Sequence, residues 1–222
     1  MPENSDFYPQ VIQRYRSAPP QPEFVSTLLG VFESKVFCAR DFEPYHLELI
    51  VDYIEHTHIY YFEKKLPEIE QSILLLSGHY ESHHPILAAL RNFFNRYVDD
   101  LQQHIQAEEE LLLPYIKVLQ RAQKSAADFS TFIAARQDYS IDRFRQEHHD
   151  TEDELKDIRQ TIRLYDPPQT NESLYRILLT QLQAFEQDLC IHAHIEEEVL
   201  IPKALKMEKD LNAQLLYLSP FN

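Results

Sequence analysis

A block of eleven residues occurs twice in the chain, and each copy places an ionisable pair inside a helical pattern. The first copy, HIQAEEELLLP, spans His104 to Pro114, and the second, HAHIEEEVLIP, spans His192 to Pro202. Side chains four residues apart lie on the same face of a helix, so Glu108 stands beside the first histidine and Glu196 beside the second. An imidazole next to a carboxylate is an arrangement of metal ligands. The duplication therefore predicts two helices that supply similar donors.

A third pair with the same spacing lies between the two copies. It consists of His148 and Glu152 in the segment EHHDTEDEL, and the three histidines follow one another at intervals of 44 residues. Three such pairs in one chain indicate an internally duplicated helical bundle built around a buried metal centre.

Composition supports a helical fold and narrows the range of partners. Two glycines against thirteen prolines allow few turns, which favours long helices and an all-α class. A formal net charge of −15 argues against nucleic acid and anionic membrane surfaces as partners. No signal segment and no run of about 20 apolar residues is seen, so we expect neither secretion nor membrane insertion. Cys38 and Cys190 lack CxxC spacing, which argues against a thiolate site or a disulfide framework and fits a reducing cytosol.

Hydrophobic periodicity predicts an up-down-up-down four-helix bundle over residues 44–210, preceded by an extension at 1–43 and followed by a tail at 211–222. The extension is expected to hold a proline-rich leader to about residue 22 and a short helix that caps the bundle. The expected helices are Glu23 to Ala39 in the extension, then a first helix from about Pro44 that is kinked at Leu66-Pro67, a second from Pro85, a third carrying Phe132 to Ile162, and a fourth from about Asn171 to Lys209.

Counting residues from the predicted turns brings the histidines to one level. His58 lies about 23 residues before the first turn and His104 about 23 after it. At a rise of roughly 1.5 Å per residue, the two histidines are therefore expected at the same height along the bundle axis. His148 and His192 stand about 19 before and 24 after the next turn, which agrees to within about one helical turn. Each of the four helices thus offers a histidine. One turn further along, Glu108, Glu152 and Glu196 form a second layer.

Polar groups inside apolar stripes must pair, lose their charge or bind a cation, and one metal centre meets that demand for all of them. Nitrogen and oxygen donors without thiolate favour iron or manganese, with zinc also possible. Glu152 lies in an acidic run, where a solvated surface role is an equal alternative. The glutamates next to the duplicated pairs are expected to face solvent or to tune the site from outside: Glu109, Glu110, Glu197 and Glu198. His79 lies 21 residues after His58, about 31 Å along a straight helix, and is expected near the turn.

These motifs, together with LPEI at Leu66, HYESHHPIL and LYDPP, resemble the hemerythrin-like (HHE) family, and more closely its repair-of-iron-centres proteins. The resemblance covers roughly Tyr45 to Met207. It implies a hemerythrin-like bundle that holds two non-haem iron ions, with the two block glutamates as bridges. The ligands it implies are His58, His104, Glu108, His148, His192 and Glu196. His79 matches a further histidine of the family pattern, to which we assign no role.

The resemblance implies iron handling or repair of iron-sulfur clusters under nitrosative or oxidative stress, with iron-sulfur proteins as partners and nitric oxide as a small ligand. The alternative is a module that binds or senses dioxygen. A third interpretation is a structural bundle with an adventitious zinc site. The repair proteins usually carry a small domain with adjacent cysteines, whereas this chain offers Cys38 in KVFCARDF. Oligomeric state is left open.

Overall fold

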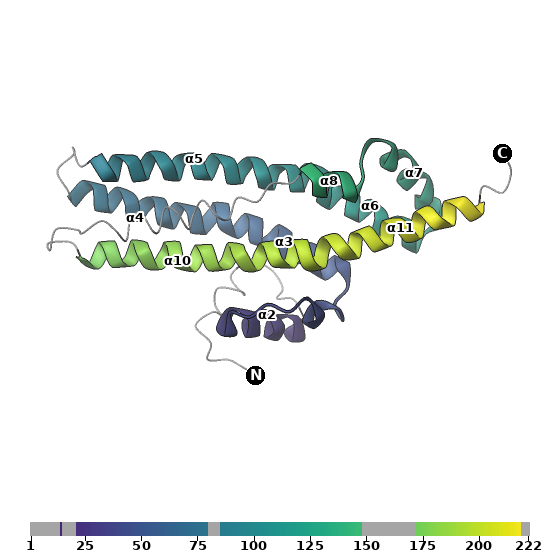
Figure 1. Ribbon diagram of the computed structural model, residues 1–222, viewed down its shortest axis with the longest axis horizontal. Coiled ribbons are helices and arrows are strands. Elements are labelled where there is room, and N and C mark those ends of the chain that lie inside the picture. The colour runs from purple at the N-terminus through teal and green to yellow at the C-terminus, as the bar shows by residue number, and fades with distance from the viewer. Residues whose placement is uncertain (1–13, 15–20, 80–84, 148–171, 219–222) are drawn as a thin grey trace.

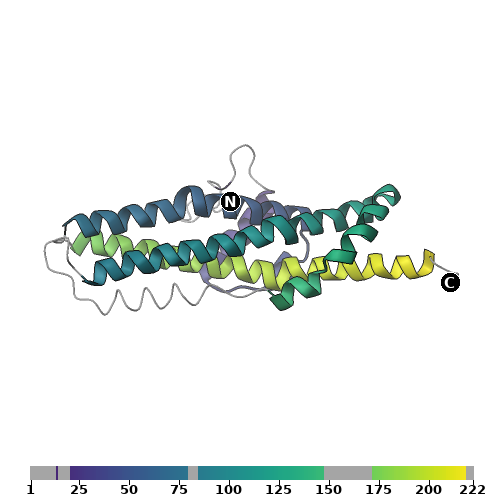
Figure 2. The same cartoon turned by 90° about the horizontal axis from the view of Figure 1, so that it is seen from above.

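The computed structural model describes residues 14, 21–79, 85–147 and 172–218. Within this part, three long helical rods lie side by side along the long axis of the molecule (Figures 1 and 2). The first rod comprises α3 (Leu47–Tyr60), η2 (Tyr61–Lys65) and α4 (Leu66–His79); the second comprises α5 (Pro85–Ala107), η3 (Glu108–Leu112) and α6 (Leu113–Lys124); the third comprises α10 (Glu172–Ile195), η6 (Glu196–Leu200) and α11 (Ile201–Leu218). The prediction of an all-α bundle is confirmed.

Each rod contains one π-helical turn, and a proline follows each turn at the same distance. The segments η2, η3 and η6 are all five residues long, and Pro67, Pro114 and Pro202 each stand two residues after the last residue of the turn. The residue before each proline donates its backbone N–H to the carbonyl five residues earlier, as Leu66 does to Tyr61. Proline has no N–H to give and its ring collides with the carbonyl four residues back, so the wider turn accommodates it without ending the rod. The rod predicted to kink at Pro67 therefore continues through a π-turn.

The apolar core is divided into two clusters. One joins the α2 helix (Pro22–Ser34), α3, α6 and α11, and the other joins α4, α5 and α10. Along each rod the change from one cluster to the other takes place within a few residues, for example between Ile54 and Tyr60 on the first rod and between Ile105 and Leu112 on the second. The candidate metal ligands lie at this boundary, so a polar layer separates the two apolar clusters.

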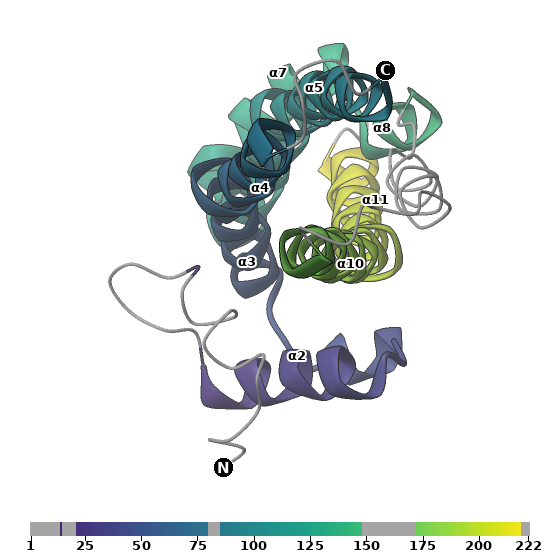
Figure 3. The same cartoon turned by 90° about the vertical axis from the view of Figure 1, so that its left-hand side faces the viewer.

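The α2 helix lies across the outside of the rods (Figure 3). Its buried face includes Phe24 and Leu28, and the backbone carbonyl of Phe32 accepts a hydrogen bond from the Gln187 side chain of α10 at 2.9 Å. The helix ends at Ser34 because Lys35 takes a left-handed conformation, with φ 57°, instead of continuing to Ala39 as predicted. A short 3-10 turn, η1 (Ala39–Phe42), then leads into α3, which begins three residues after Pro44.

The third predicted helix is broken in the part that the structure describes. After the 3-10 turn η4 (Ala126–Asp128), the helix α7 (Phe129–Asp138) ends at Tyr139, which is extended with φ −146° and ψ 151°. A separate helix, α8 (Ile141–Glu147), follows. The hydroxyl of Ser140 accepts the backbone N–H of Arg143 at 3.2 Å, and this N-terminal cap begins a new helix where the periodicity predicted one continuous helix.

At the other end, α11 continues to Leu218 and so includes most of the predicted tail. Among the described helices, none combines the length and the low polarity that a bilayer crossing demands.

Candidate metal centre

Glu108 lies at the middle of the polar layer. Its carboxylate is fully buried, and it contacts two histidines from different rods: Oε1 lies 2.7 Å from His104 Nε2 and Oε2 lies 3.1 Å from His58 Nε2. The contact with His104 follows from their spacing of four residues on one helical face. The contact with His58 joins the first rod to the second.

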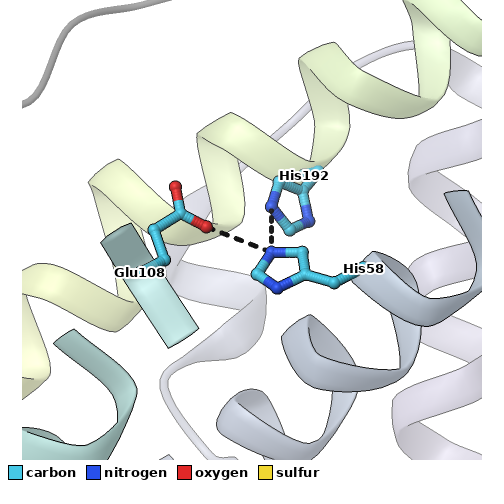
Figure 4. A group of neighbouring side chains, drawn as sticks. All are labelled: His58, Glu108 and His192. Atoms are coloured by element: carbon cyan, nitrogen blue, oxygen red, sulfur yellow. Dashed lines mark hydrogen bonds and ion pairs between the residues drawn. The ribbon is translucent and has the colours of Figure 1, made fainter. Parts of the chain in front are cut away.

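His192 approaches the same point from the third rod. Figure 4 shows its ring beside that of His58, with Glu108 opposite, and the two Nε2 atoms are 3.3 Å apart. His58 is 1% exposed and His192 is 5% exposed, so neither imidazole meets bulk water. Three rods thus direct two nitrogens and one carboxylate toward one small volume.

Two groups of donors can be formed, and Glu108 belongs to both. His58, Glu108 and His192 make the first group, while His104, Glu108 and Glu196 make the second; within each group the ligand atoms lie within 4.8 Å of one another. A carboxylate that offers one oxygen to each of two groups is suited to bridge two cations. Each of the two groups could hold a cation, and Glu108 and Glu196 of the layer expected from the sequence both take part.

Burial and charge shift the pKa values of these groups in different directions. Burial alone would raise the pKa of Glu108, but the contacts with His104 and His58 hold it well below its ordinary value. Burial lowers the pKa of His58, yet Glu108 and Glu109 more than compensate, so that its pKa is raised. Burial and then the charge of His58 hold the pKa of His192 well below its ordinary value. A lowered pKa favours the neutral imidazole, which is the form that can donate a lone pair to a metal.

The structure brings together five of the seven residues proposed from the sequence: His58, His104, Glu108, His192 and Glu196. The other two, His148 and Glu152, lie outside the described residues. His79 is the last residue of α4, at the end of the first rod.

The glutamates beside the block pairs take different positions. The carboxylate of Glu109 is half-exposed and lies 3.0 Å from His58 Nδ1, so it orients the ring from outside the donor groups. Glu110 accepts a hydrogen bond from the exposed Gln106 side chain, and Glu198 lies 3.9 Å from the outward-facing His194.

Sequence reasoning missed a buried ion pair next to His192. Asp188, one turn before His192 on α10, accepts from the guanidinium of Arg14, and Tyr61 also donates to it. Helical spacing could have identified Asp188 and Tyr61 as buried polar residues, because both lie in the apolar stripes of their helices. Arg14 gave no such signal, because it stands in a proline-rich leader.

Cys190 faces away from the donor groups. Its thiol lies 3.5 Å from His194 Nδ1 and lines a cavity of about 410 Å³ between α2 and α10. The same Nδ1 lies 2.6 Å from the Cys190 carbonyl.

Residues 50–204 match the model of the hemerythrin HHE cation-binding domain. The chain belongs to the hemerythrin HHE family. The match runs from the start of the first rod into α11 and so contains every donor named above. As a hemerythrin-type domain the chain binds a metal cation, and the buried histidines and glutamates are the candidates for its ligands.

Named relatives of this hemerythrin domain are iron-sulfur cluster repair proteins. ScdA of Staphylococcus haemolyticus is 23% identical over 154 residues, which cover 69% of this chain and 65% of ScdA. YtfE of Yersinia pseudotuberculosis is 24% identical over 184 residues, which cover 81% of this chain and 76% of YtfE. A YtfE protein of Yersinia pestis matches to the same extent. The chain thus spans just under two thirds of the length of ScdA.

The donor set fits the cation that a hemerythrin domain binds. Imidazole nitrogens and carboxylate oxygens are the ligands of non-haem iron, and they also suit manganese and zinc. Glu108 and Glu196 are nearly fully buried carboxylates at a boundary between two apolar clusters, where a bound cation would add to the stabilisation that the neighbouring histidines give.

Proposed function

We propose that the protein is a non-haem di-iron protein that acts in iron handling or in the repair of iron-sulfur clusters. The observation that carries the proposal is the buried Glu108 carboxylate, shared between two donor groups from three rods. The names of the relatives support the choice of iron and of iron-sulfur proteins as partners.

The ligands in this proposal are His58, His104, Glu108, His192 and Glu196, with His148 and Glu152 added from the sequence. Bound iron would supply a redox-active Lewis acid able to take nitric oxide or dioxygen as a small ligand. The chain's own residues fix the ligand geometry: Glu109 holds His58 by its Nδ1, and His192 Nε2 lies 3.3 Å from His58 Nε2, in the same donor group as Glu108. The apolar clusters on either side exclude bulk water.

Two free thiols are compatible with a reducing compartment, and we propose a cytoplasmic location for this activity. Cys38 is exposed and Cys190 is partly exposed, and neither forms a disulfide within the described residues.

The proposal is tested by loading the protein anaerobically with ferrous iron and measuring iron content and the visible spectrum. The loaded protein is then incubated with an iron-sulfur enzyme that has been inactivated by oxidation or nitric oxide. We expect two irons per chain and recovery of the enzyme's activity. Both should be lost with Glu108→Ala or Glu196→Ala and kept with Glu110→Ala, which alters an exposed carboxylate of the same block.

Two outcomes would contradict the proposal in different ways. Less than one iron per chain would favour a structural bundle with an adventitious zinc site. Two irons with a reversible visible change on oxygenation, but no recovery of the damaged enzyme, would favour the dioxygen-binding or sensing module.

A further inference from the structure

Arg14 is buried inside the helical array although it belongs to the leader. It is 2% exposed, and Nη2 donates to both carboxylate oxygens of Asp188 at 2.6 Å. Nη1 donates to the hydroxyls of Tyr53 at 2.8 Å and Thr57 at 3.0 Å. The guanidinium also lies within 5.6 Å of the ring centres of Phe32, Tyr53 and Tyr60.

A buried ion pair of this kind is not explained by stability alone. Removing a guanidinium and a carboxylate from water is expensive, and apolar side chains of similar size often stabilise a fold at least as well. Asp188 is 1% exposed, so both partners bear this desolvation. In some proteins such a pair is kept because it fixes the conformation of the groups around it.

The proline after each π-turn gives a common reference point for comparing positions in the three rods. His104 stands ten residues before Pro114 and His192 stands ten before Pro202, and in the first rod Thr57 stands ten before Pro67. The matching glutamates, Glu108 and Glu196, stand six residues before their prolines, and the residue at that place in the first rod is Tyr61.

The first rod therefore has Thr57 and Tyr61 where the other two have a His–Glu pair. Thr57 accepts from the Arg14 guanidinium, and the Tyr61 hydroxyl donates to Asp188 at 3.2 Å. In this rod the matching positions contact the buried ion pair, Thr57 at the guanidinium and Tyr61 at the carboxylate.

The ion pair connects to the candidate metal centre through one aromatic ring. Tyr61 is fully buried, and its ring packs edge-on against the His192 ring with centroids 5.7 Å apart and an interplanar angle of 62°. Phe185 meets the same tyrosine at 88° and 5.1 Å. The hydroxyl bond to Asp188 thus fixes the tyrosine that packs against one face of a proposed ligand.

We propose that Arg14 and Asp188 position the metal centre, by anchoring Tyr61 so that it holds the His192 ring with Nε2 directed toward His58 Nε2 and into the first donor group. The proposal rests on the proposed function, because it assigns His192 as a ligand. The ion pair has no net charge, so its removal tests orientation and leaves the local charge unchanged.

The test compares three variants with the wild-type chain. Arg14→Met with Asp188→Leu removes the pair without leaving a buried charge, and Tyr61→Phe removes the hydroxyl alone. Tyr115→Phe is the matched control, because the Tyr115 hydroxyl donates to the buried Glu208 at 2.6 Å in the other apolar cluster.

Metal dissociation constants are measured by competition with a chelator, and the visible spectrum of the iron-loaded chain is recorded. Loss of a partner that orients a metal-bound histidine weakens metal binding by about 10 to 100-fold. We expect a loss in this range, with a changed spectrum, for the double variant and for Tyr61→Phe. Tyr115→Phe should stay within about twofold of wild type even if its free energy of unfolding falls.

Each possible result either supports the positioning role or contradicts it. Wild-type dissociation constants and spectra in both Tyr61→Phe and the double variant would overturn the positioning role while the metal centre stands, and an equal loss in Tyr115→Phe would show a general effect of destabilisation. If the wild-type chain holds no metal, the proposed function fails, and the imidazole NMR signals of His192 in the metal-free chain then decide the matter. Signals that shift in Tyr61→Phe but not in Tyr115→Phe support the anchoring, and unchanged signals refute it.

Discussion

Replacing Glu108 by glutamine tests the shared carboxylate most directly. The substitution keeps the size of the side chain and removes its charge, so neither donor group retains an anionic bridge. Because Glu108 belongs to both groups, we expect iron content to fall from two ions per chain to less than one, with no remaining half-occupied site.

The size of the effect on stability follows from the two linked sites. A ligand at 100 times its dissociation constant stabilises the folded state by about 2.7 kcal/mol per site, which gives roughly 5 kcal/mol for two sites. A chain of 222 residues gains about 2–4 °C in Tm per kcal/mol, so saturating iron should raise the Tm of the wild-type protein by roughly 10–20 °C. In Glu108→Gln this increment should nearly vanish.

The assay is anaerobic thermal unfolding followed by circular dichroism, with and without ferrous iron, together with iron analysis of the desalted protein. Glu110→Gln is the control, because that carboxylate is exposed and lies in the same π-turn. If Glu108→Gln still holds two irons and shows the full increment in Tm, the carboxylate is not the bridge and the argument from shared donors is refuted.

Three further predictions concern residues around the centre. Glu109→Gln should weaken metal binding by about 10-fold or more in a chelator competition, because the His58 Nδ1 loses an anionic partner; unchanged affinity would show that the exposed contact is incidental. Leu119→Ala should lower the free energy of unfolding in urea by about 2–5 kcal/mol while iron content stays the same, since it opens a cavity in a cluster away from the ligands. The pKa values of Tyr53 and Tyr115 are raised, chiefly by burial, so the metal-free protein should keep their contribution below pH about 10 and lose stability as pH rises further. The tyrosinate absorbance of these two residues, obtained by subtracting the titrations of Tyr53→Phe and Tyr115→Phe from that of the wild type, should appear together with loss of helical signal. Their ionisation before unfolding would contradict the burial argument.

The rods and the level of the site were predictable because two periodic signals coincide. Apolar residues at helical spacing define the buried face of each rod, and polar groups at His58, Glu108 and His192 interrupt that face. An α-helix has a fixed rise per residue, so counting from the turns predicted His58 level with His104, and Glu108 one turn further along. In the structure, Glu108 lies in one group with His58 and His192 and in a second group with His104 and Glu196. Whether these residues hold iron stays a prediction.

Other features depend on contacts that local sequence does not encode. The break between α7 and α8 depends on the Ser140 cap, which overrides a continuous apolar pattern. A proline follows each π-turn, but a proline inside a helical pattern is equally compatible with a kink, so the sequence alone does not predict a π-turn. Arg14 is buried by partners that lie 39 to 174 residues away in the chain. Helical periodicity does not predict contacts over such separations.

The comparison of the three rods explains how one repeated pattern can serve two different cations. All three carry a π-turn and a proline at the same spacing, but the first rod has Thr57 and Tyr61 at the places of the histidine and the glutamate. Successive residues on a helix point about 100° apart, so His58, next to Thr57, is directed toward Glu108 while Thr57 meets the guanidinium. The first rod therefore contributes one ligand to the candidate metal centre and, on its adjacent face, accepts Arg14 as a fixed cation. A substitution that moved the histidine back to position 57 would bring an imidazole to the guanidinium and take a donor from the metal, so we expect Thr57→His with His58→Thr to lose metal binding despite restoring the repeat. Metal affinity equal to wild type in that double variant would show that the offset of one residue carries no function.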